Sequence, residues 1–395
     1  MLPSAPIDIR WWPNRVYFAV GGVAQARHVL ADLRVNRALV VCGKTVARGP
    51  MLAKVRNALG GACAGVFEDV QNHTPLASVK RGVEAVRRIG ADAIVSVGGG
   101  SATDCGKGIA ILHASAGDLA PYAVDYGRKG FERLALPAGG LVHVAIPTTT
   151  GSASEVMPTA GVRDVAAKKK LLFWDARIVP DAVIYDPEMT VHCNAHLTAA
   201  SGMTAMARCI EALYSRDRNP ISTALALHGA RLLNAALPKT IADPNDLAAR
   251  ADCLLASGMS GIAAINAMAS VVHAICHPLG GRFGLQHGIG HAMLLAPALR
   301  RVLPAIGADA GFVLEALGSD RAHGAGSAEA SAAAAAAAMT ALLGRLPLPQ
   351  RLREVGIERA NIDQLTADTM GDYMMAFAPT RLDAEDVGAL IAAAW

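Results

Sequence analysis

The sequence predicts a parallel α/β domain followed by an all-helical domain. In the first half, short β-branched runs alternate with helix-like stretches, which is typical of a doubly wound parallel sheet. After about residue 195 the strand-like runs stop, and alanine, leucine and methionine recur at helical spacing. At 395 residues the chain is long enough for two cores. We therefore expect two domains, residues 1–190 and 191–395.

Individual elements follow from the same patterns. The apolar runs expected to be strands are 37–42, 93–97, 142–146 and 182–185. Apolar residues at three- and four-residue spacing predict a helix over 75–89. The alanine-rich run 327–339 contains neither Gly nor Pro, so we expect a surface helix there rather than a linker.

Composition argues against several classes of protein. Hydrophobic residues make up 52% and charged ones 18%, which is typical of a globular chain rather than a disordered one. The net charge of +4 is small, and no Lys/Arg run indicates a nucleic-acid surface. No signal peptide or membrane-spanning run is evident. The seven cysteines lack CxxC spacing, which favours free thiols and a cytoplasmic protein.

A glycine-rich loop follows one of the expected strands. Gly98, Gly99 and Gly100 precede Ser101, which we expect to be the N-cap of a helix, with Asp104 completing a capping arrangement. Glycines let a backbone approach a diphosphate, and a helix N-terminus offers N–H groups and a positive dipole end. The loop is neither a GxGxxG nor a Walker motif, so a plain turn stays an alternative.

A second loop, residues 146–155, also follows an expected strand and carries five hydroxyl side chains beside Gly151. Hydroxyls of this kind can bond to ribose and diphosphate oxygens. An ordinary Ser/Thr loop that caps a helix has the same composition.

Several histidines gather in an apolar stretch of the second half. His273 and His277 are spaced to share one helix face, and His287 follows ten residues later. Burying imidazoles together costs free energy unless they bind a metal, a substrate or each other. The cluster therefore indicates a functional site, with satisfied core histidines as the alternative.

Together these motifs resemble those of the iron-containing (group III) alcohol dehydrogenases. The matching patterns are Gly98-Gly99-Gly100-Ser101-x-x-Asp104, Pro147-Thr148-Thr149-x-Gly151-x-x-Ser154-Glu155 and His273-x3-His277-Pro-Leu-Gly with His287-Gly. The resemblance implies a dehydroquinate synthase-like fold with NAD(P) and a divalent metal held between the two domains. The cofactor contacts that it implies are Gly98, Gly99, Gly100, Ser101, Asp104, Thr148, Thr149, Ser152 and, for the ribose, Lys170.

The resemblance also implies four metal ligands, and two of them are replaced here. In that family an Asp and a His one helical turn apart join two histidines that match His273 and His287. Thr204 and Arg208 stand at the first two positions of this sequence. A hydroxyl is a poor ligand for zinc or iron(II), and a guanidinium cannot bind a metal. We therefore expect no tightly bound iron or zinc.

Arg208 is expected to take over part of the metal's role. A fixed cation with several N–H donors can stabilise a developing alkoxide and can bind a carboxylate, which favours an anionic substrate. His277 or His273 would relay a proton. The alternative is that Arg208 folds back onto Glu211 and leaves the site inactive.

One position bears on the choice of cofactor. Relatives that prefer NAD resemble one another in an aspartate after the strand expected over residues 37–42, where this sequence has Gly43 and then Lys44. Without that carboxylate a 2′-phosphate is not repelled, so NADP(H) is favoured over NAD(H). Gly43 is equally compatible with a plain turn.

The sequence thus predicts an NAD(P)H-dependent reductase of a small aldehyde or oxo acid, and we expect a homodimer. Reduction of an unsaturated oxo-dicarboxylate is an alternative. The segments 276–283, 287–291 and 210–214 and the turn 73–75 resemble those of maleylacetate reductases. A lyase or cyclase of the dehydroquinate synthase type and an inactive nucleotide-binding member are two competing hypotheses.

Overall fold

A computed structural model describes residues 14–115, 118–124, 135–136, 140–167, 169–319 and 327–395. The chain divides between His192 and Cys193 into two compact units. We call them the N-terminal unit and the helical unit and describe each by itself.

The N-terminal unit is built on a six-stranded sheet with the order β1-β8-β5-β4-β2-β3, in which every pairing is parallel. The four expected strands and the parallel sheet are confirmed, and the sequence prediction missed the first and third strands. The strands are β1 (Arg15–Phe18), β2 (Ala38–Gly43), β3 (Cys63–Val70), β4 (Ala93–Gly98), β5 (Val142–Pro147) and β8 (Ala182–Tyr185).

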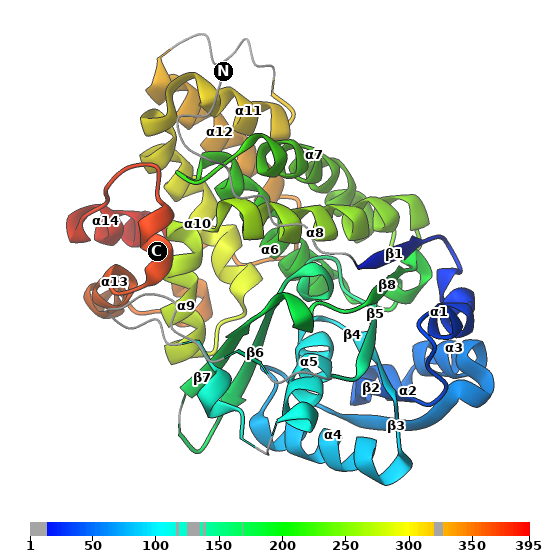
Figure 1. The fold of residues 1–395 in the computed structure, drawn as a ribbon. Coiled ribbons are helices and arrows are strands. Elements are labelled where there is room, and N and C mark those ends of the chain that lie inside the picture. The colour runs from blue at the N-terminus through cyan, green and yellow to red at the C-terminus, as the bar shows by residue number, and fades with distance from the viewer. Residues whose placement is uncertain (1–13, 116–117, 125–134, 137–139, 168, 320–326) are drawn as a thin grey trace. The chain divides into compact units, whose positions relative to one another are not determined.

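Helices cover both faces of this sheet (Figure 1). Val40 of β2 packs in a core with the helices on one face, whereas its neighbours Leu39 and Val41 pack on the other, as the alternation of a strand requires. The first core includes α1 (Ala26–Asp32) and α3 (Pro50–Leu59), and the second α4 (Leu76–Ile89) and α5 (Gly100–Ala114). The expected helix over 75–89 is confirmed as α4.

An antiparallel hairpin, which the sequence prediction missed, is added to the second face. It consists of β6 (Thr159–Asp164) and β7 (Lys169–Trp174). Ala160, Val162 and Phe173 of the hairpin are buried in the same core as α4 and α5. The hairpin therefore packs against the helix that follows the glycine-rich loop.

The helical unit confirms the predicted all-helical second half. Its α-helices are α6 (Ala195–Tyr214), α7 (Pro220–Ala242), α8 (Leu247–Ala267), α9 (Val271–Phe283), α10 (His287–Val302), α11 (Ala310–Ala316), α12 (Ala328–Leu343), α13 (Ile362–Met370) and α14 (Ala384–Ala394). The alanine-rich run forms α12, but it is not a plain surface helix. Ala332, Ala335, Ala336 and Met339 are buried in the core of this unit.

One continuous helical run, His287–Ala316, is long and apolar enough in composition to cross a membrane. Just over half of its most apolar window, 56%, is buried inside the fold. Leu294, Leu295 and Leu299 of this run belong to the core of the helical unit. Burial accounts for its apolar character, as in the core helix of a globular protein.

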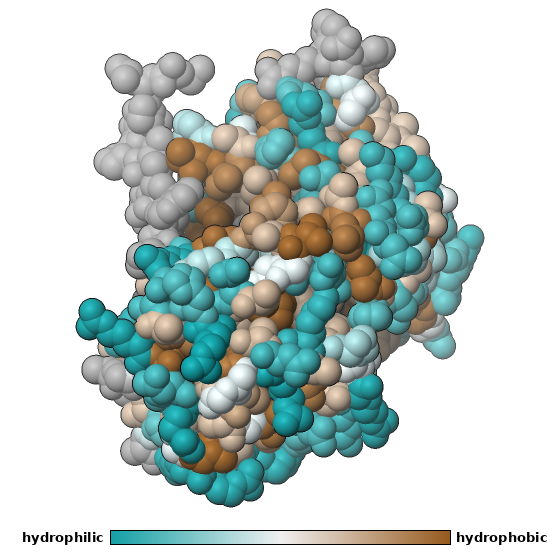
Figure 2. All heavy atoms as spheres, turned by 90° about the vertical axis from the view of Figure 1, so that its right-hand side faces the viewer, coloured by the Kyte–Doolittle hydropathy of each residue, from teal (hydrophilic) through white to brown (hydrophobic). Residues whose placement is uncertain are grey.

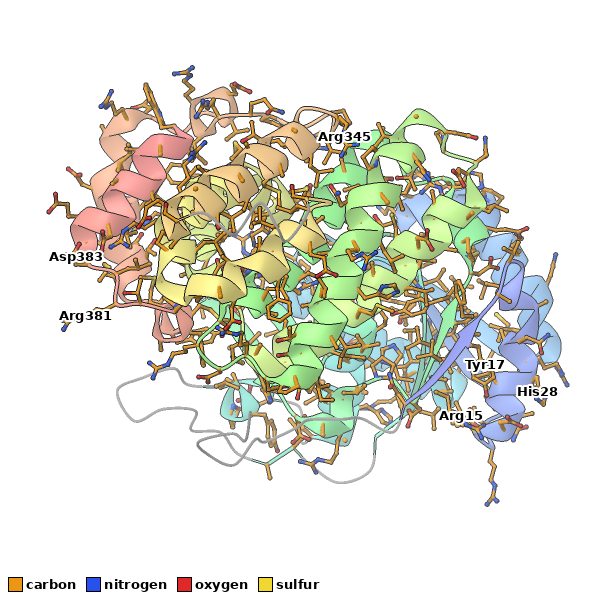
Figure 3. All side chains as sticks on the ribbon, turned by 90° about the horizontal axis from the view of Figure 1, so that it is seen from above. Arg15, Tyr17, His28, Arg345, Arg381 and Asp383 are labelled. Carbon is orange, nitrogen blue, oxygen red and sulfur yellow. The ribbon has the colours of Figure 1, made fainter. Side chains whose placement is uncertain are left out.

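The edge of the sheet combines polar and apolar side chains. Figure 3 shows Arg15 and Tyr17 on β1 beside α1, which carries His28. Arg15 donates to Asp32 of α1 over 3.0 Å, which ties the edge strand to its covering helix. Val16, Phe18 and Val20 are exposed. On the side of the molecule that carries β1, hydrophobic patches interrupt a mostly hydrophilic surface (Figure 2).

Candidate functional site

The glycine-rich loop joins the buried strand β4 directly to α5. Gly98 has a φ of +152°, a backbone conformation that residues with a side chain rarely adopt. A Cβ at this position would also lie 2.8 Å from the Cβ of Ala102. The N-cap of α5 is Gly99, and no side chain in the described chain caps the helix. The predicted N-cap Ser101 was therefore wrong, because β4 runs through Gly98 and α5 begins at Gly100. An uncapped helix start offers its N–H groups to an anion.

The second loop lies against the glycines. A Cβ on Gly99 would lie 3.1 Å from the side chain of Thr149, and one on Gly100 would lie 3.0 Å from Ser152. The backbone N–H of Thr148 donates to the carbonyl of Gly98 over 3.0 Å. The structure therefore brings together most of the residues that the resemblance assigns to the cofactor.

Asp104 does not take part in the expected capping arrangement. One carboxylate oxygen accepts from the hydroxyl of Ser154 over 2.5 Å, and the other accepts from the backbone N–H of Gly161 over 3.0 Å. Asp104 thus joins α5 to the second loop and to strand β6. In this structure the carboxylate supports the loops rather than the start of the helix.

Lys107 has a similar supporting role. Its ammonium group is buried and donates to the carbonyls of Ser154, Met157 and Thr159, the last two over 2.7 Å. Burial lowers the pKa of Lys107 to about 8, against the opposite effect of Asp104 and Glu155. The lysine that follows the glycines is therefore engaged inside the protein and does not extend toward solvent.

A strained turn lies beside the glycine-rich loop. His73 and Thr74 have φ values of 61° and 49°, a left-handed conformation that is unfavourable for a β-branched residue. The hydroxyl of Thr74 donates to the carbonyl of Ser101 over 3.2 Å, which fixes the turn against α5. The pKa of His73 is lowered by burial and then by the positive charges of Lys170 and Arg163.

Of the three remaining candidate cofactor contacts, Lys170 and Lys44 are exposed and Gly43 is partly exposed. The side chain of Lys170 lies over Gly161, where a Cβ would be 2.7 Å from its Cε. Gly43 ends β2 and is the N-cap of α2 (Lys44–Arg48), and its φ of −90° is not one that requires glycine. Lys44 is exposed at the first position of α2. Neither lysine is brought into a buried site within the described chain.

In the helical unit, Glu211 of α6 holds the start of α9. Its Oε1 accepts from the backbone N–H groups of Ser270, Val272 and His273, over 3.0, 2.9 and 3.3 Å. Its Oε2 is paired with Nδ1 of His273. Burial raises the pKa of Glu211 to about 7, although the backbone N–H groups act in the opposite direction. Glu211 is thus directed at α9, in contrast to the expected alternative of a pair with Arg208.

His291 is a further member of the histidine cluster. It is fully buried, its ring centroid is 4.2 Å from that of His273, and neither ring nitrogen has a hydrogen-bond partner among the described atoms. Burial, His273 and then Arg208 lower its pKa well below the usual value. For His273, burial and then the charge of Arg208 have the same effect on the pKa. The cation therefore acts on both buried imidazoles.

Thr204 and Arg208 lie on the same side of α6, one turn apart, where both are partly exposed. The hydroxyl of Thr204 donates to the carbonyl of Ala200 over 3.2 Å. α10 approaches this face so closely that a Cβ on Gly288 would be 1.7 Å from that carbonyl oxygen. The positions that the resemblance assigns to two metal ligands thus hold a hydroxyl donor and a cation.

The donor set at these positions does not fit a metal with four protein ligands. Nδ1 of His273 is paired with Glu211, which leaves Nε2 as the one nitrogen of that ring that could be a ligand. A guanidinium has no lone pair to offer, and a threonine hydroxyl is a poor ligand for zinc or iron(II). Within the described residues, no group of three or more His, Cys, Asp or Glu side chains is arranged to hold a metal ion.

His277 has a more open environment one turn along α9. Its Nδ1 is 2.6 Å from Oδ2 of Asp372, and its side chain is 32% exposed. The ring of Tyr373 stacks on it at 6.2 Å and 23°, and the ring of His287 lies at 5.9 Å. His273, His277, His287 and His291 therefore form one continuous cluster.

The sequence prediction missed Asp372 and the role of Glu211. Asp372 is 95 residues from His277 and carries no motif that could have indicated it. Glu211 lies in the segment 210–214, which resembles other family members, and its position on the Thr204–Arg208 side of α6 was the available signal.

Comparison with known proteins identifies the family of this chain. Residues 13–187 match the family described as iron-containing alcohol dehydrogenase, and residues 198–395 match its C-terminal family. Maleylacetate reductase 2 of Cupriavidus pinatubonensis is 34% identical over 318 residues, 80% of each chain. The 1,3-propanediol dehydrogenase of Klebsiella pneumoniae is 33% identical over 330 residues, 84% of this chain and 83% of its own. A crystal structure of a 1,3-propanediol oxidoreductase superposes with a TM-score of 0.91 at 30% identity, covering 98% of this chain and 100% of that one.

The fold and these matches define an oxidoreductase with a nucleotide-binding α/β unit and a helical unit. The chain belongs to the iron-containing alcohol dehydrogenase family, and its relatives include both maleylacetate reductases and 1,3-propanediol dehydrogenases.

Proposed function

We propose that this protein is an NAD(P)H-dependent reductase that transfers hydride to the carbonyl of a small aldehyde or oxo acid. The observation that supports this most strongly is the position of Arg208, which is partly exposed on α6 one turn from Thr204. Burial lowers the pKa values of His273 and His291, and the charge of Arg208 acts in the same direction. A cation among imidazoles that resist protonation can stabilise the negative charge that develops on a reduced carbonyl oxygen. A carboxylate on the substrate would also be attracted by it.

The cofactor would bind at the glycine-rich loop. The uncapped start of α5 supplies N–H groups for a diphosphate, and Thr148, Thr149 and Ser152 supply backbone and hydroxyl groups beside it. NAD(P)H would supply the hydride when bound. Lys44, exposed after β2, has the charge needed for a 2′-phosphate, so we propose a preference for NADPH.

His277 is the better candidate for the proton relay. It is 32% exposed, whereas His273 is 9% exposed as a side chain and its Nδ1 is engaged by a buried carboxylate. A proton donor must reach both the substrate and, in each cycle, the solvent. We propose that His273 and His291 shape the site, and that catalysis proceeds without a tightly bound metal because of Thr204 and Arg208.

The decisive variant is Arg208→Ala. Turnover in a screen of aldehydes and oxo acids, followed by NADPH absorbance, is expected to fall about 100- to 1,000-fold, as for loss of one oxyanion-stabilising donor. Binding of NADPH, measured by fluorescence titration, is expected to be unchanged. Metal analysis of the purified protein accompanies the screen. Wild-type turnover in the variant, or activity that requires stoichiometric zinc or iron, would contradict the proposal.

The competing functions differ either in the substrate or in what happens to the cofactor. A maleylacetate reductase would reduce an unsaturated oxo-dicarboxylate, so the oxo acids in the screen include such a compound. A lyase or cyclase would show no net consumption of NADPH, and an inactive member would bind it without turnover.

We further propose a cytoplasmic homodimer. The exposed apolar side chains of Val16, Phe18 and Val20 lie on or beside an edge strand, where a second copy would cover them. Sedimentation of the purified protein tests the oligomeric state.

A further inference from the structure

We propose that Asp372 is the positioning residue of the reaction, which fixes the ring and the Nδ1 proton of His277 so that Nε2 is the nitrogen that exchanges a proton with the substrate oxygen. The inference rests on the proposed reductase function and adds to it a residue that no sequence motif indicates. It is carried by the geometry of a carboxylate held in place by its own backbone surroundings.

Backbone hydrogen bonds fix the orientation of Asp372, independently of His277. Its backbone N–H donates to the carbonyl of Thr369 over 2.9 Å, and its Oδ1 accepts from the backbone N–H of Met374 over 2.9 Å. It thereby caps the short helix η11 (Tyr373–Phe377). With Oδ1 engaged by the cap, Oδ2 is directed at Nδ1 of His277 over 2.6 Å.

Residues near Asp372 in the sequence make further contacts with α9 and with the ring of His277. Tyr373, the next residue, stacks on it at an interplanar angle of 23°. Four residues before Asp372, Asp368 pairs with Arg282 of α9, with Nη2 of the arginine 2.8 Å from Oδ1. Two carboxylates from one segment therefore contact α9, but only one of them touches a histidine.

A carboxylate can only accept a hydrogen bond, so its partner nitrogen must carry the proton. Nδ1 of His277 is then protonated in the neutral ring, and Nε2 is left as the acceptor. A histidine whose tautomer is fixed in this way presents one defined nitrogen to the reacting atom, as in other carboxylate–histidine pairs. In the direction of reduction, Nε2 first takes up a proton from solvent. The ring then gives that proton to the alkoxide oxygen formed by hydride transfer and returns to the neutral Nδ1–H form.

The substitution Asp372→Asn separates positioning from folding. Because the N–H of Met374 requires an acceptor, the amide oxygen of the new side chain is expected to keep the cap, and its NH2 group then faces His277. An NH2 donor favours the opposite tautomer, with the proton on Nε2. The variant is therefore expected to keep the geometry of the site and to move the proton of the neutral His277 ring from Nδ1 to Nε2.

The experiment compares Asp372→Asn, Asp372→Glu and the matched control Asp368→Asn. We expect Asp372→Asn to lower kcat about 100-fold or more, within the usual contribution of a proton-transfer group, and to leave the KM for NADPH unchanged. Asp372→Glu, which restores a carboxylate, should recover activity to within about tenfold of the wild type. Asp368→Asn should keep kcat within about twofold of the wild type, because the partner of Asp368 is Arg282 rather than a histidine.

Nitrogen-15 spectra of histidine-labelled protein give the tautomer directly. The His277 signal is assigned with His277→Gln, and wild type and variant are compared at the same alkaline pH. The wild type should show Nδ1–H, and Asp372→Asn should show Nε2–H. Wild-type kcat in Asp372→Asn, or a loss of kcat with the tautomer unchanged, would overturn the proposal.

The two readouts also separate this inference from the proposed function. If the wild type reduces no carbonyl, the reductase assignment fails, and the tautomer alone then decides whether Asp372 positions His277. A switch between wild type and Asp372→Asn supports the pairing, and an identical tautomer in both refutes it.

Discussion

His273 and His277 lie one turn apart on α9, and each gives Nδ1 to a carboxylate, yet their surroundings differ. Glu211 is fully buried and its histidine nearly so, whereas the side chains of Asp372 and His277 are 14% and 32% exposed. The buried carboxylate also accepts three backbone N–H groups from the start of α9. The same pair of residue types therefore supports the fold in one place and is open to a reaction in the other.

Burial explains why these roles separate. A buried carboxylate paired with an imidazole gains little net stability, but removing one partner leaves the other group desolvated and unsatisfied. A partly exposed pair can be rehydrated when it is broken. The buried pair should therefore matter mainly for stability, and the open pair mainly for turnover.

The largest expected effect is that of Glu211→Ala on stability. The substitution leaves His273 and the three N–H groups of α9 without their acceptor, so we expect a loss of about 3–5 kcal/mol in the free energy of unfolding. Urea unfolding followed by circular dichroism measures it. Glu211→Gln is the control and should lose less, because its amide oxygen still accepts. A loss below about 1 kcal/mol for the alanine variant would remove the contrast between the two pairs.

A second test breaks the packing that brings the histidine cluster against α6. A Cβ on Gly288 would meet the carbonyl oxygen of Ala200 at 1.7 Å and the hydroxyl of Thr204 at 2.8 Å. Gly288→Ala must push α10 away from α6, at a cost of about 3 kcal/mol. We expect a lower urea midpoint and reduced turnover.

Gly281 is the matched control for this test. It also lies in a helix, but a Cβ there would meet no described atom within 4 Å. Gly281→Ala should be neutral or slightly stabilising, because alanine has the higher helix propensity. Equal midpoints for the two variants would show that the close approach of α10 is unimportant.

Much of the fold could be predicted because it depends on local pattern. The β-branched runs became β2, β4, β5 and β8, and the periodic run became α4. The hairpin β6–β7 could not be found in this way, since its burial comes from packing against α5. The prediction of Ser101 as the N-cap was wrong for a related reason. The end of β4, and not the Ser101 hydroxyl, determines where α5 begins.

The candidate site was predictable to the same degree. The loops and the histidines are contiguous motifs, and the replacement of two ligand positions could be seen in α6 alone. The partners of those residues are long-range contacts. Asp104 looks like a capping residue in sequence, but its oxygens are used by residues 50 and 57 positions later. Asp372 and Glu211 likewise acquire their roles only once distant helices pack.

A third histidine shows what burial does when there is no carboxylate. His143 of β5 is buried, its Nε2 is 2.8 Å from the hydroxyl of Ser96, and burial lowers its pKa to about 3. Below pH 6.5 the unfolded chain takes up a proton that the folded chain refuses, so stability must fall as the pH falls from about 6.5 toward 3.

The prediction for His143 is a difference in pH dependence. Between pH 7 and pH 5 this one group should remove about 2 kcal/mol from the free energy of unfolding, and His143→Gln should lack that component. Urea unfolding of both proteins at the two pH values measures the difference. Parallel curves for wild type and variant would mean that His143 is protonated in the folded state.

The smallest expected effect is that of Asp368→Asn. This substitution removes the exposed ion pair between Asp368 and Arg282, which involves no histidine. Asp368 and Arg282 have side chains 25% and 48% exposed, so water and salt can replace the lost interaction. We expect a urea midpoint that is unchanged at physiological salt and only slightly lower at low salt. The pair joins α9 to α13, immediately before the segment that carries Asp372. A clear loss at physiological salt would therefore mean that the docking of these segments depends on surface charge. Any loss of turnover in Asp372→Asn would then have to be compared with that structural contribution.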